Sequence, residues 1–330
     1  MRELCIFTFK SFNSFKFVVL WSNFKFDKLN QPRIHIEAHY LKELLYFVFF
    51  CFGFALLGAI FIKFAGSLLG MENASQMAKN LTANSTADER NQIRFFLFLS
   101  HFFTFLLPCI AYAIWRYRSA TLQELHLNKI PHLNNILYCT IIILVAFNFV
   151  MLLMWINQQI PLTEAMIKSE EMAAEMTKNL LILDSRWELV ITLFAVAVTP
   201  AIGEELMFRG ILQPTFEKLF KNGHVAVWLS AILFSAIHFQ MQGFIPRMFL
   251  GAILGYFYLW SRNLWIPILA HFVFNGSQVL GKYFNKIEIE TPNIEFSEII
   301  IPSLVSLTFL LGLGYLFWKF NKSKDRPINL

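Results

Sequence analysis

Charged residues are scarce in this chain, and several common features of soluble proteins are missing. Asp, Glu, Lys and Arg make up 15% of the 330 residues, whereas hydrophobic residues make up 56%. Soluble domains carry about 25% charged residues, so the composition excludes an ordinary soluble domain. The four cysteines show no CxxC spacing, which argues against a zinc knuckle and against a disulfide framework. The sequence therefore predicts a polytopic membrane protein.

The excess of basic residues does not indicate a nucleic-acid partner. The net charge is +6, but the basic residues are spread over connecting segments and form no single stripe. No internal repeat is evident. No cleavable signal peptide is evident either, because the apolar part of the N-terminal stretch contains lysines and lacks a small-residue cleavage site. We predict that residues 1–42 are a basic segment of uncertain structure, appended to a core that lies in the lipid bilayer.

The apolar segments predict an all-α fold, a bundle of about eight transmembrane helices within residues 43–320, followed by a cytoplasmic tail at 321–330. A spanning helix needs about 20 mostly apolar residues, and the fifth to seventh segments are short by that measure. The predicted spans are 43–69, 93–114, 136–156, 187–214, 224–239, 244–261, 264–280 and 298–319.

The charged residues between these spans predict the orientation of the bundle. The segments at 115–135 and 215–223 are basic, as are both flanks of the bundle, whereas 157–186 and 282–298 carry the acids. Lys and Arg accumulate on the cytoplasmic side of membrane proteins. We therefore predict that both termini are cytoplasmic, that the acidic segments are outside, and that the protein resides in the plasma (inner) membrane.

The fourth predicted span contains charged residues where none are expected. Its stretch "TPAIGEELMFRGILQP" places Glu204, Glu205 and Arg209 in an apolar helix, and each such charge costs about 2.5–3.5 kcal/mol on insertion scales. Glu205 and Arg209 are spaced i,i+4 and could form a structural ion pair. Glu204 lies about 100° further round the helix and has no such local partner, so a functional role is the competing explanation.

Two later spans also carry polar groups. "AILFSAIHFQ" places His238 one turn after Phe234, and "ILAHFVFNGS" places His271 one turn before Asn275. One intramembrane histidine alone is more often a contact between helices than a catalyst. From the rise per residue, Glu204, His238 and His271 lie about 15, 21 and 10 Å from the cytoplasmic ends of their spans, so all three could meet at one level.

Taken together, these motifs resemble the signature of the CPBP intramembrane proteases, which include the type II CAAX prenyl endopeptidases and the bacteriocin-processing or Abi proteins. The resemblance covers roughly residues 187–281, and residues 1–160 do not inform it. The residues that carry it are, in chain order, Glu204-Glu205-x-x-x-Arg209, Phe234-x-x-x-His238 and His271-x-x-x-Asn275.

The resemblance implies a helical core around a cavity open to the cytoplasm. It further implies hydrolysis of a peptide bond in a membrane-associated or lipidated, CAAX-like protein, so that a hydrophobic or prenylated peptide is the expected partner. It assigns residue roles as well. Glu204, next to Glu205, would activate water with the assistance of His238, and no cofactor would be needed. His271 and Asn275 would stabilise the oxyanion, and the supporting residues would be Arg209, Phe208 and Phe234.

Three alternatives remain open at this stage. Two histidines and a carboxylate can form a zinc site, so the same residues could serve a metalloendopeptidase with Glu204, His238 and His271 as ligands. Intramembrane Glu and His also mark ion pathways, so a transporter is possible. A non-proteolytic immunity or scaffold protein is the third. The chain has no HExxH, no GxSG-type serine and no GxGD aspartate, which argues against the other intramembrane protease chemistries.

Two backbone features complete the expectations. Pro200 removes a helical hydrogen bond and clashes with the carbonyl four residues earlier, so we predict that the helix kinks or restarts near Thr199. A restart would place Glu204 near a helix amino end. Gly251 and Gly255, in "GAILG", predict a face on which a neighbouring helix packs closely.

Overall fold

The computed structural model describes residues 31–68, 80–285 and 295–323, with side chains described from residue 38 onward, and every regular element in these residues is helical. The all-α membrane bundle predicted from the sequence is confirmed. Its longer α-helices are α1 (Gln31–Leu68), α3 (Ala87–His101), α4 (Leu107–Tyr117), α6 (Leu133–Gln158), α7 (Glu164–Leu180), α11 (Gly223–Ala236), α12 (Phe244–Ser261), α13 (Trp265–Asn285) and α14 (Phe296–Lys322). The remaining elements are the short α-helices α5 (Thr121–Glu124), α8 (Arg186–Thr192), α9 (Thr199–Glu205) and α10 (Gln213–Phe220), the 3-10 turn η2 (Arg118–Ala120), and three π-helical segments, η1 (Phe102–Leu106), η3 (Leu193–Val198) and η4 (Leu206–Leu212).

Five helical stretches of the described chain are long and apolar enough to cross a membrane. They are Ala38–Leu68, Ala87–Glu124, Leu133–Gln158, Arg186–Phe220 and Phe296–Lys322. The three other predicted spans are helices too, namely α11, α12 and α13, and α11 is a shorter apolar helix. The predicted number of eight spans is therefore approximate, and the uncertain members are the three that were short in the sequence.

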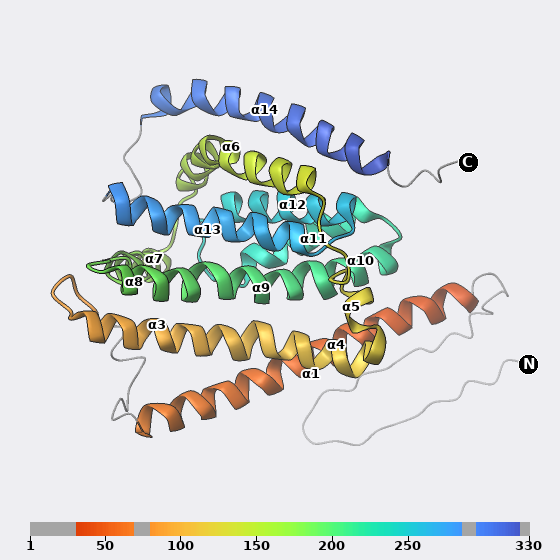
Figure 1. The fold of residues 1–330 in the computed structure, drawn as a ribbon, viewed down its shortest axis with the longest axis horizontal. Helices are drawn as coiled ribbons and strands as arrows, with labels where there is room; N and C mark the ends of the chain where they lie inside the picture. The colour runs from red at the N-terminus through yellow and green to blue at the C-terminus, as the bar shows by residue number, and fades with distance from the viewer. Residues whose placement is uncertain (1–30, 69–79, 286–294, 324–330) are drawn as a thin grey trace, which may run out of the picture.

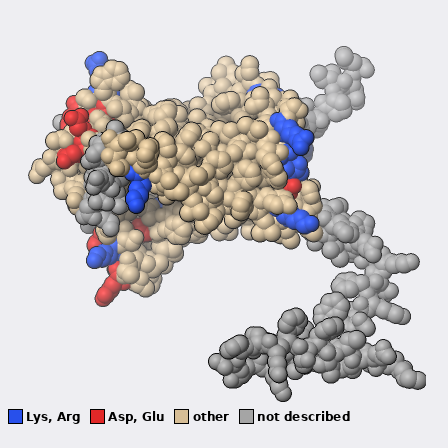
Figure 2. Space-filling model, turned by 90° about the horizontal axis from the view of Figure 1, so that it is seen from below, with Lys and Arg blue, Asp and Glu red and all other residues tan. Residues whose placement is uncertain are grey.

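The surface agrees with a position in the bilayer. Figure 2 shows the acidic and basic side chains gathered at the two ends of the molecule, with an uncharged belt across the middle. Large apolar side chains of α1 face outward, among them Phe49 at 73% and Phe52 at 64% exposure. In water such an exposed apolar surface would favour aggregation, whereas in a bilayer the lipid chains cover it without a free-energy penalty. Helix α1 begins at Gln31, so part of the segment predicted as an appendage, residues 31–42, extends the first span, and residues 1–30 lie outside the described residues.

Of the two outcomes predicted at Pro200, the restart of the helix is wrong, and the kink stays a prediction. Segments α8, η3, α9, η4 and α10 follow one another without interruption as one long helix (Figure 1). The backbone instead widens into a π-helix, η3, which ends two residues before Pro200. A π-segment shifts the hydrogen bonds by one residue and so accommodates a proline without a break. Because the helix does not restart, Glu204 gains no support from a helix amino end.

A π-helical segment before a proline occurs three times among the described helices. Each π-segment ends two residues before a proline: η1 before Pro108, η3 before Pro200 and η4 before Pro214. Proline lacks an N–H and pushes against the carbonyl four residues earlier, which favours this widening. Local sequence chemistry thus places irregular backbone on both sides of α9, the helix that carries the two glutamates.

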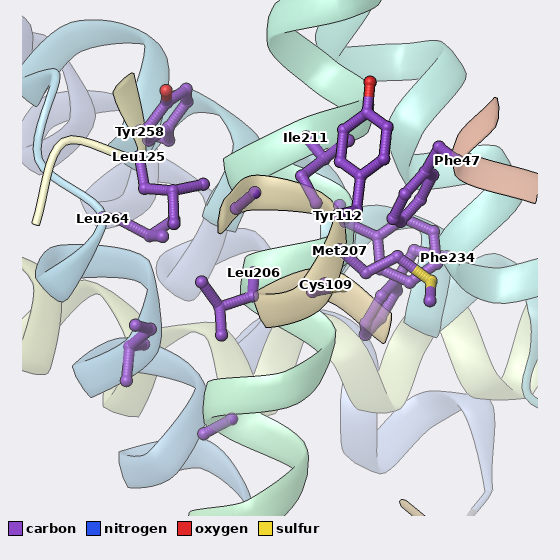
Figure 3. Close-up of a cluster of buried hydrophobic side chains, with 14 residues drawn as sticks. Phe47, Cys109, Tyr112, Leu125, Leu206, Met207, Ile211, Phe234, Tyr258 and Leu264 are labelled. Carbon is purple, nitrogen blue, oxygen red and sulfur yellow. The ribbon is translucent and has the colours of Figure 1, made fainter. Parts of the chain in front are cut away.

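The core fixes α9 among its neighbours. In Figure 1, α9 lies between α3 and α13, and it contacts both. A cluster of buried apolar side chains joins η4 to α1, α4, α11 and the turn before α13, as Figure 3 shows for Phe47, Tyr112, Met207, Phe234 and Leu264. Burial of such side chains contributes about 1.5–3 kcal/mol each in water, and inside a bilayer the close packing itself supplies the attraction.

The predicted glycine face of α12 packs against α11 as expected. A Cβ on Gly251 would lie 3.2 Å from the Cα of Ala231, and one on Gly255 would lie 2.9 Å from Val227. Only glycine allows the two backbones to approach this closely. The prediction is confirmed, and its consequence for the site is that the carbonyls of α12 come within reach of η4.

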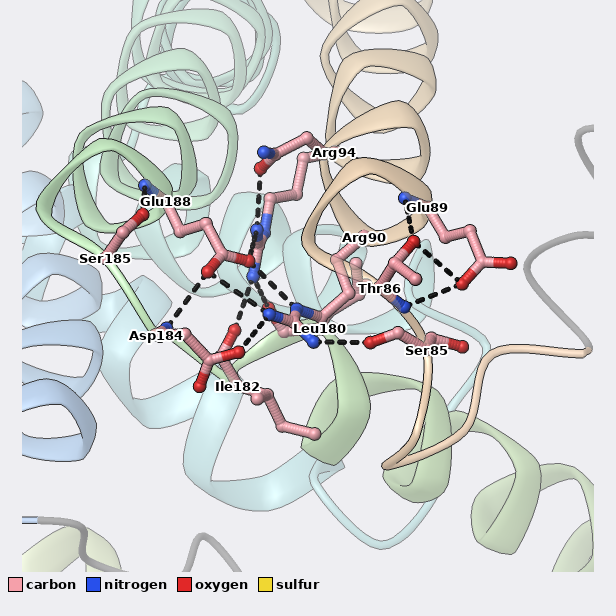
Figure 4. Close-up of polar contacts among 11 residues, drawn as sticks. Ser85, Thr86, Glu89, Arg90, Arg94, Leu180, Ile182, Asp184, Ser185 and Glu188 are labelled. Atoms are coloured by element: carbon pink, nitrogen blue, oxygen red, sulfur yellow. Dashed lines mark hydrogen bonds and ion pairs between the residues drawn. The ribbon is translucent and has the colours of Figure 1, made fainter.

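A buried charged network ties α3 to the start of α8 (Figure 4). The Glu188 carboxylate accepts hydrogen bonds from Arg90 Nε and Arg94 NH1, both at 2.9 Å. Arg94 also donates to the carbonyls of Leu180 and Ile182. All three charged side chains are at most 3% exposed, and the exposed Asp184, which pairs with Arg90, supplies the second carboxylate for the two arginines. The network sets the position of α3 along the long helix.

Candidate functional site

Glu205 is the acceptor in a fully buried ion pair. Its Oε1 accepts a hydrogen bond from Arg209 NH1 at 2.7 Å, and neither side chain is exposed. Arg209 NH2 donates to the Gly251 carbonyl at 2.6 Å, and the guanidinium lies 4.9 Å from the centre of the Phe234 ring. The i,i+4 ion pair predicted from the sequence is therefore present. It links η4 to α11 and α12, which is the arrangement of a structural clamp.

His271 lies against the same carboxylate. Its Nδ1 is 2.8 Å from Glu205 Oε1, and the side chain is 4% exposed. An ionised carboxylate can only accept hydrogen bonds, so Nδ1 of His271 carries the proton. Nε2 is therefore the ring nitrogen that remains available to a substrate. The sequence did not predict a contact between His271 and Glu205, since i,i+4 spacing identifies neighbours only within one helix.

Glu204 is buried and pairs with a residue that the sequence analysis did not select. Its Oε1 lies 2.9 Å from His101 Nε2, with side-chain exposures of 5% for Glu204 and 27% for His101. His101 ends α3 and stacks on Phe105, with ring centres 4.9 Å apart. A histidine inside the predicted span 93–114 was the available signal, and it was missed because the family motifs begin only after residue 187.

His238 follows the end of α11, outside the regular helix. Its Nδ1 lies 2.9 Å from the Phe234 carbonyl oxygen. A carbonyl only accepts, so Nδ1 carries the proton and a neutral His238 has the lone pair on Nε2. The ring is thus held in the tautomer that can accept a proton from water. His238 makes no direct hydrogen bond to Glu204 in this arrangement.

The Asn275 side chain forms a hydrogen bond with the main chain of η3. Its Nδ2 donates to the Val196 carbonyl at 3.1 Å, in π-segment η3. The contact ties α13 to the helix that carries the glutamates. The amide nitrogen has two protons, so a second donor remains for another partner.

Four of the selected residues, Phe208, Arg209, His238 and His271, nevertheless lie around the Phe234 ring. The Phe234 ring lies 5.5 Å from His238, 5.9 Å from His271 and 5.3 Å from Phe208, centre to centre. Two of the histidines contact the glutamates directly, since His101 Nε2 lies 2.9 Å from Glu204 Oε1 and His271 Nδ1 lies 2.8 Å from Glu205 Oε1. Phe208 and Phe234 are 1% and 2% exposed, and they form an apolar surface beside the Arg209 guanidinium and the rings of His238 and His271.

The cavity that the family resemblance implies stays a prediction. One surface hollow, of about 500 Å³, lies beside Lys129, Ile130 and Trp265, and a second, of about 270 Å³, lies between Trp260 and Trp318. Neither is lined by a residue of the candidate site.

The described residues do not fit a metal ion as they stand. A catalytic zinc needs about three protein ligands around one point. No group of three or more His, Cys, Asp or Glu in the described part of the chain is arranged in that way. The nearest nitrogen–oxygen contacts instead pair His101 with Glu204 and His271 with Glu205, so the alternative ligand set of Glu204, His238 and His271 is not assembled around one point.

Comparison with known proteins agrees with the class that the site indicates. Residues 186–277 match the family model described as "Type II CAAX prenyl endopeptidase Rce1-like". The matched segment runs from the start of α8 into α13 and contains all three motifs. The resemblance to the CPBP family, which the sequence motifs suggested, is therefore confirmed for this segment.

Two curated relatives share part of the chain. The "Uncharacterized protein YpbD" of Bacillus subtilis (strain 168) is 33% identical over 80 residues, which is 23% of this chain and 38% of that protein. The "Membrane-embedded CAAX protease MroQ" of Staphylococcus aureus (strain USA300) is 27% identical over 101 residues, or 29% of this chain and 40% of that protein. The chain thus spans about two fifths of the length of each relative. No solved structure matches the chain significantly.

Proposed function

We propose that the protein is an intramembrane endopeptidase that hydrolyses a peptide bond of a membrane-associated or lipidated, CAAX-like protein. The observation that carries the proposal is the buried Glu204 carboxylate, 4% exposed, inside a long apolar helix and beside a second, separately neutralised glutamate. A buried charge that is merely structural would be expected to share the ion pair. Glu204 stands apart from that pair and contacts His101 of another helix.

In the proposed reaction, Glu204 accepts a proton from water as the water oxygen bonds to the carbonyl carbon of the substrate. His238 assists through Nε2, the nitrogen that carries the lone pair. The carbon–nitrogen bond then breaks, and the proton held by Glu204 passes to the departing amine. A base placed in this way contributes about 10²–10⁴-fold to the rate.

The tetrahedral intermediate carries a negative oxygen that needs donors. With Nδ1–H bonded to Glu205, the His271 ring presents Nε2 to the intermediate and donates from it when both ring nitrogens carry protons. The second proton of the Asn275 amide is the other donor. Loss of one such donor costs about 10²–10³-fold in kcat in other hydrolases.

The names of the relatives and the apolar surroundings support the proposed substrate class. The matched family is named for CAAX prenyl endopeptidases and one relative is named a CAAX protease, and the candidate site lies within an apolar bundle. A peptide that carries a lipid or a hydrophobic end would partition into the same bilayer and reach the site along it. The enzyme needs no organic cofactor for this chemistry.

Comparison of protein C-termini in cells that carry the wild type and cells that carry Glu204→Gln tests the proposal. Glu217→Gln is the matched control, because Glu217 lies on α10 and pairs with Arg262 at the surface. The proposal predicts C-termini that are trimmed in wild-type and Glu217→Gln cells and retained in Glu204→Gln cells. Identical C-termini in all three, with equal amounts of protein in the membrane, would overturn it.

A further inference from the structure

His101 contacts the reactive carboxylate from outside the family-matched segment. It belongs to α3, whereas the matched segment begins at residue 186. Its Nε2 lies 2.9 Å from Glu204 Oε1, the one hydrogen bond that the Glu204 side chain makes in the described structure. None of the residues in the three motifs shared with the family forms a hydrogen bond with the Glu204 carboxylate in the described structure.

The close approach of α3 to α9 is built into the backbone. A Cβ on Gly203 would lie 3.0 Å from the Cβ of Phe105 and 3.3 Å from the backbone nitrogen of Leu106. Both neighbours belong to η1, which begins directly after His101. Glycine at position 203 therefore lets this irregular segment lie against the turn that carries Glu204.

A second contact fixes α3 at its other end. Arg90 and Arg94 bond Glu188 at the start of the same long helix, as described above. With the α3 backbone fixed at both ends, the position of the His101 ring is determined by the fold. Its stacking on Phe105 further restricts the ring to one orientation.

We propose that His101 is a positioning residue for Glu204, and the inference rests on the proposed function. His101 donates Nε2–H to Glu204 Oε1 and so holds the carboxylate plane, which leaves Oε2 to accept the proton of water. Without this bond the carboxylate rotates about its terminal torsion, which has no strong rotamer preference of its own. Misplacement of a reacting group by about 1 Å can cost about 100-fold in rate.

Kinetics of the purified full-length protein in liposomes, with a farnesylated CAAX peptide as the probe, test the inference. Two variants separate the hydrogen bond from the ring: His101→Phe keeps a ring without a donor, and His101→Gln keeps a donor without the ring. We expect His101→Phe to lower kcat by about 10- to 100-fold with KM unchanged, and His101→Gln to recover most of that loss.

The matched control uses the same substitutions at a distant histidine. His224→Phe and His224→Gln remove the contact between His224 and the Tyr256 hydroxyl at the start of α11, and both should leave kcat unchanged. A second test is Gly203→Ala, which pushes η1 away from α9. It should lower kcat in the wild type and add little in the His101→Phe background, because the contact is then already lost.

The outcomes distinguish this inference from the proposed function. If Glu204→Gln is inactive and His101→Phe is as active as the wild type, the positioning role is wrong and the proposed function stands. Equal losses in His101→Phe and His101→Gln, or a change in KM alone, also overturn the positioning role. If Glu204→Gln keeps full activity, the proposed function itself is wrong, regardless of the activities of the His101 variants.

Discussion

The Asn275 side chain donates to the Val196 carbonyl, in the π-segment that leads into Pro200. In an α-helix the Val196 carbonyl would pair with the N–H of residue 200, and proline has none. Asn275 Nδ2 lies 3.1 Å from that oxygen. The Asn275 amide therefore ties α13 to the widened part of the long helix.

This relationship predicts that Asn275 and Pro200 are coupled. Asn275→Ala should lower kcat/KM, and Pro200→Ala should give position 200 a backbone N–H that can bond the Val196 carbonyl in place of the amide. If the amide acts through the carbonyl, the loss caused by Asn275→Ala shrinks in the Pro200→Ala background, by a coupling of about 0.5–3 kcal/mol. Ser277→Ala on the same helix, where the hydroxyl bonds only its own turn, is the control. Fully additive effects would assign Asn275 to the oxyanion alone.

The clamp around Glu205 predicts different outcomes for two neighbouring charges. Arg209→Ala leaves Glu205 buried without its cation, and breaking a buried pair in this way costs about 3–5 kcal/mol. We expect much less folded protein in the membrane. Glu204→Gln should fold nearly as well as the wild type, because an amide oxygen can still accept from His101. Membrane yield and thermal unfolding in detergent measure both, and equal losses would mean that Glu204 belongs to the same structural network.

Several parts of this arrangement were readable from the sequence, and others were not. Spacing within one helix can be taken directly from the sequence. It predicts the apolar segments, the ion pair of Glu205 with Arg209 and the glycine face of α12. Contacts between helices far apart in the chain, such as His101 with Glu204 and His271 with Glu205, depend on how the bundle packs. The π-helical widening before Pro200 could not be predicted from the sequence either. A proline can break a helix or be accommodated by a π-segment, and the packing around it decides which occurs.

Metal dependence has a direct test. The paired contacts of Glu204 and Glu205 with separate histidines predict that hydrolysis survives exhaustive chelation. A zinc-dependent protease treated in the same buffer shows that the chelator works. Loss of hydrolysis, followed by recovery on addition of zinc, would favour the metal-dependent alternative with the same residues, since the metal would then activate the water.

The charge distribution predicts the orientation of the bundle. Lys168 on α7 and Lys322 at the end of α14 are both exposed. In a background without the four native cysteines, Lys168→Cys should react with a membrane-impermeant reagent from outside. Lys322→Cys should react only after the membrane is opened. Reaction of both from the same side would contradict the predicted topology.

The central claim is that the Glu204 carboxylate activates water for peptide hydrolysis, and one measurement addresses it directly. Purified wild type, Glu204→Gln and Glu217→Gln are reconstituted in liposomes with a farnesylated CAAX peptide, and the products are identified by mass. We predict that the wild type and Glu217→Gln release the C-terminal fragment at similar rates, and that Glu204→Gln releases at least about 100-fold less while equally folded. Release by Glu204→Gln at the wild-type rate would contradict the account.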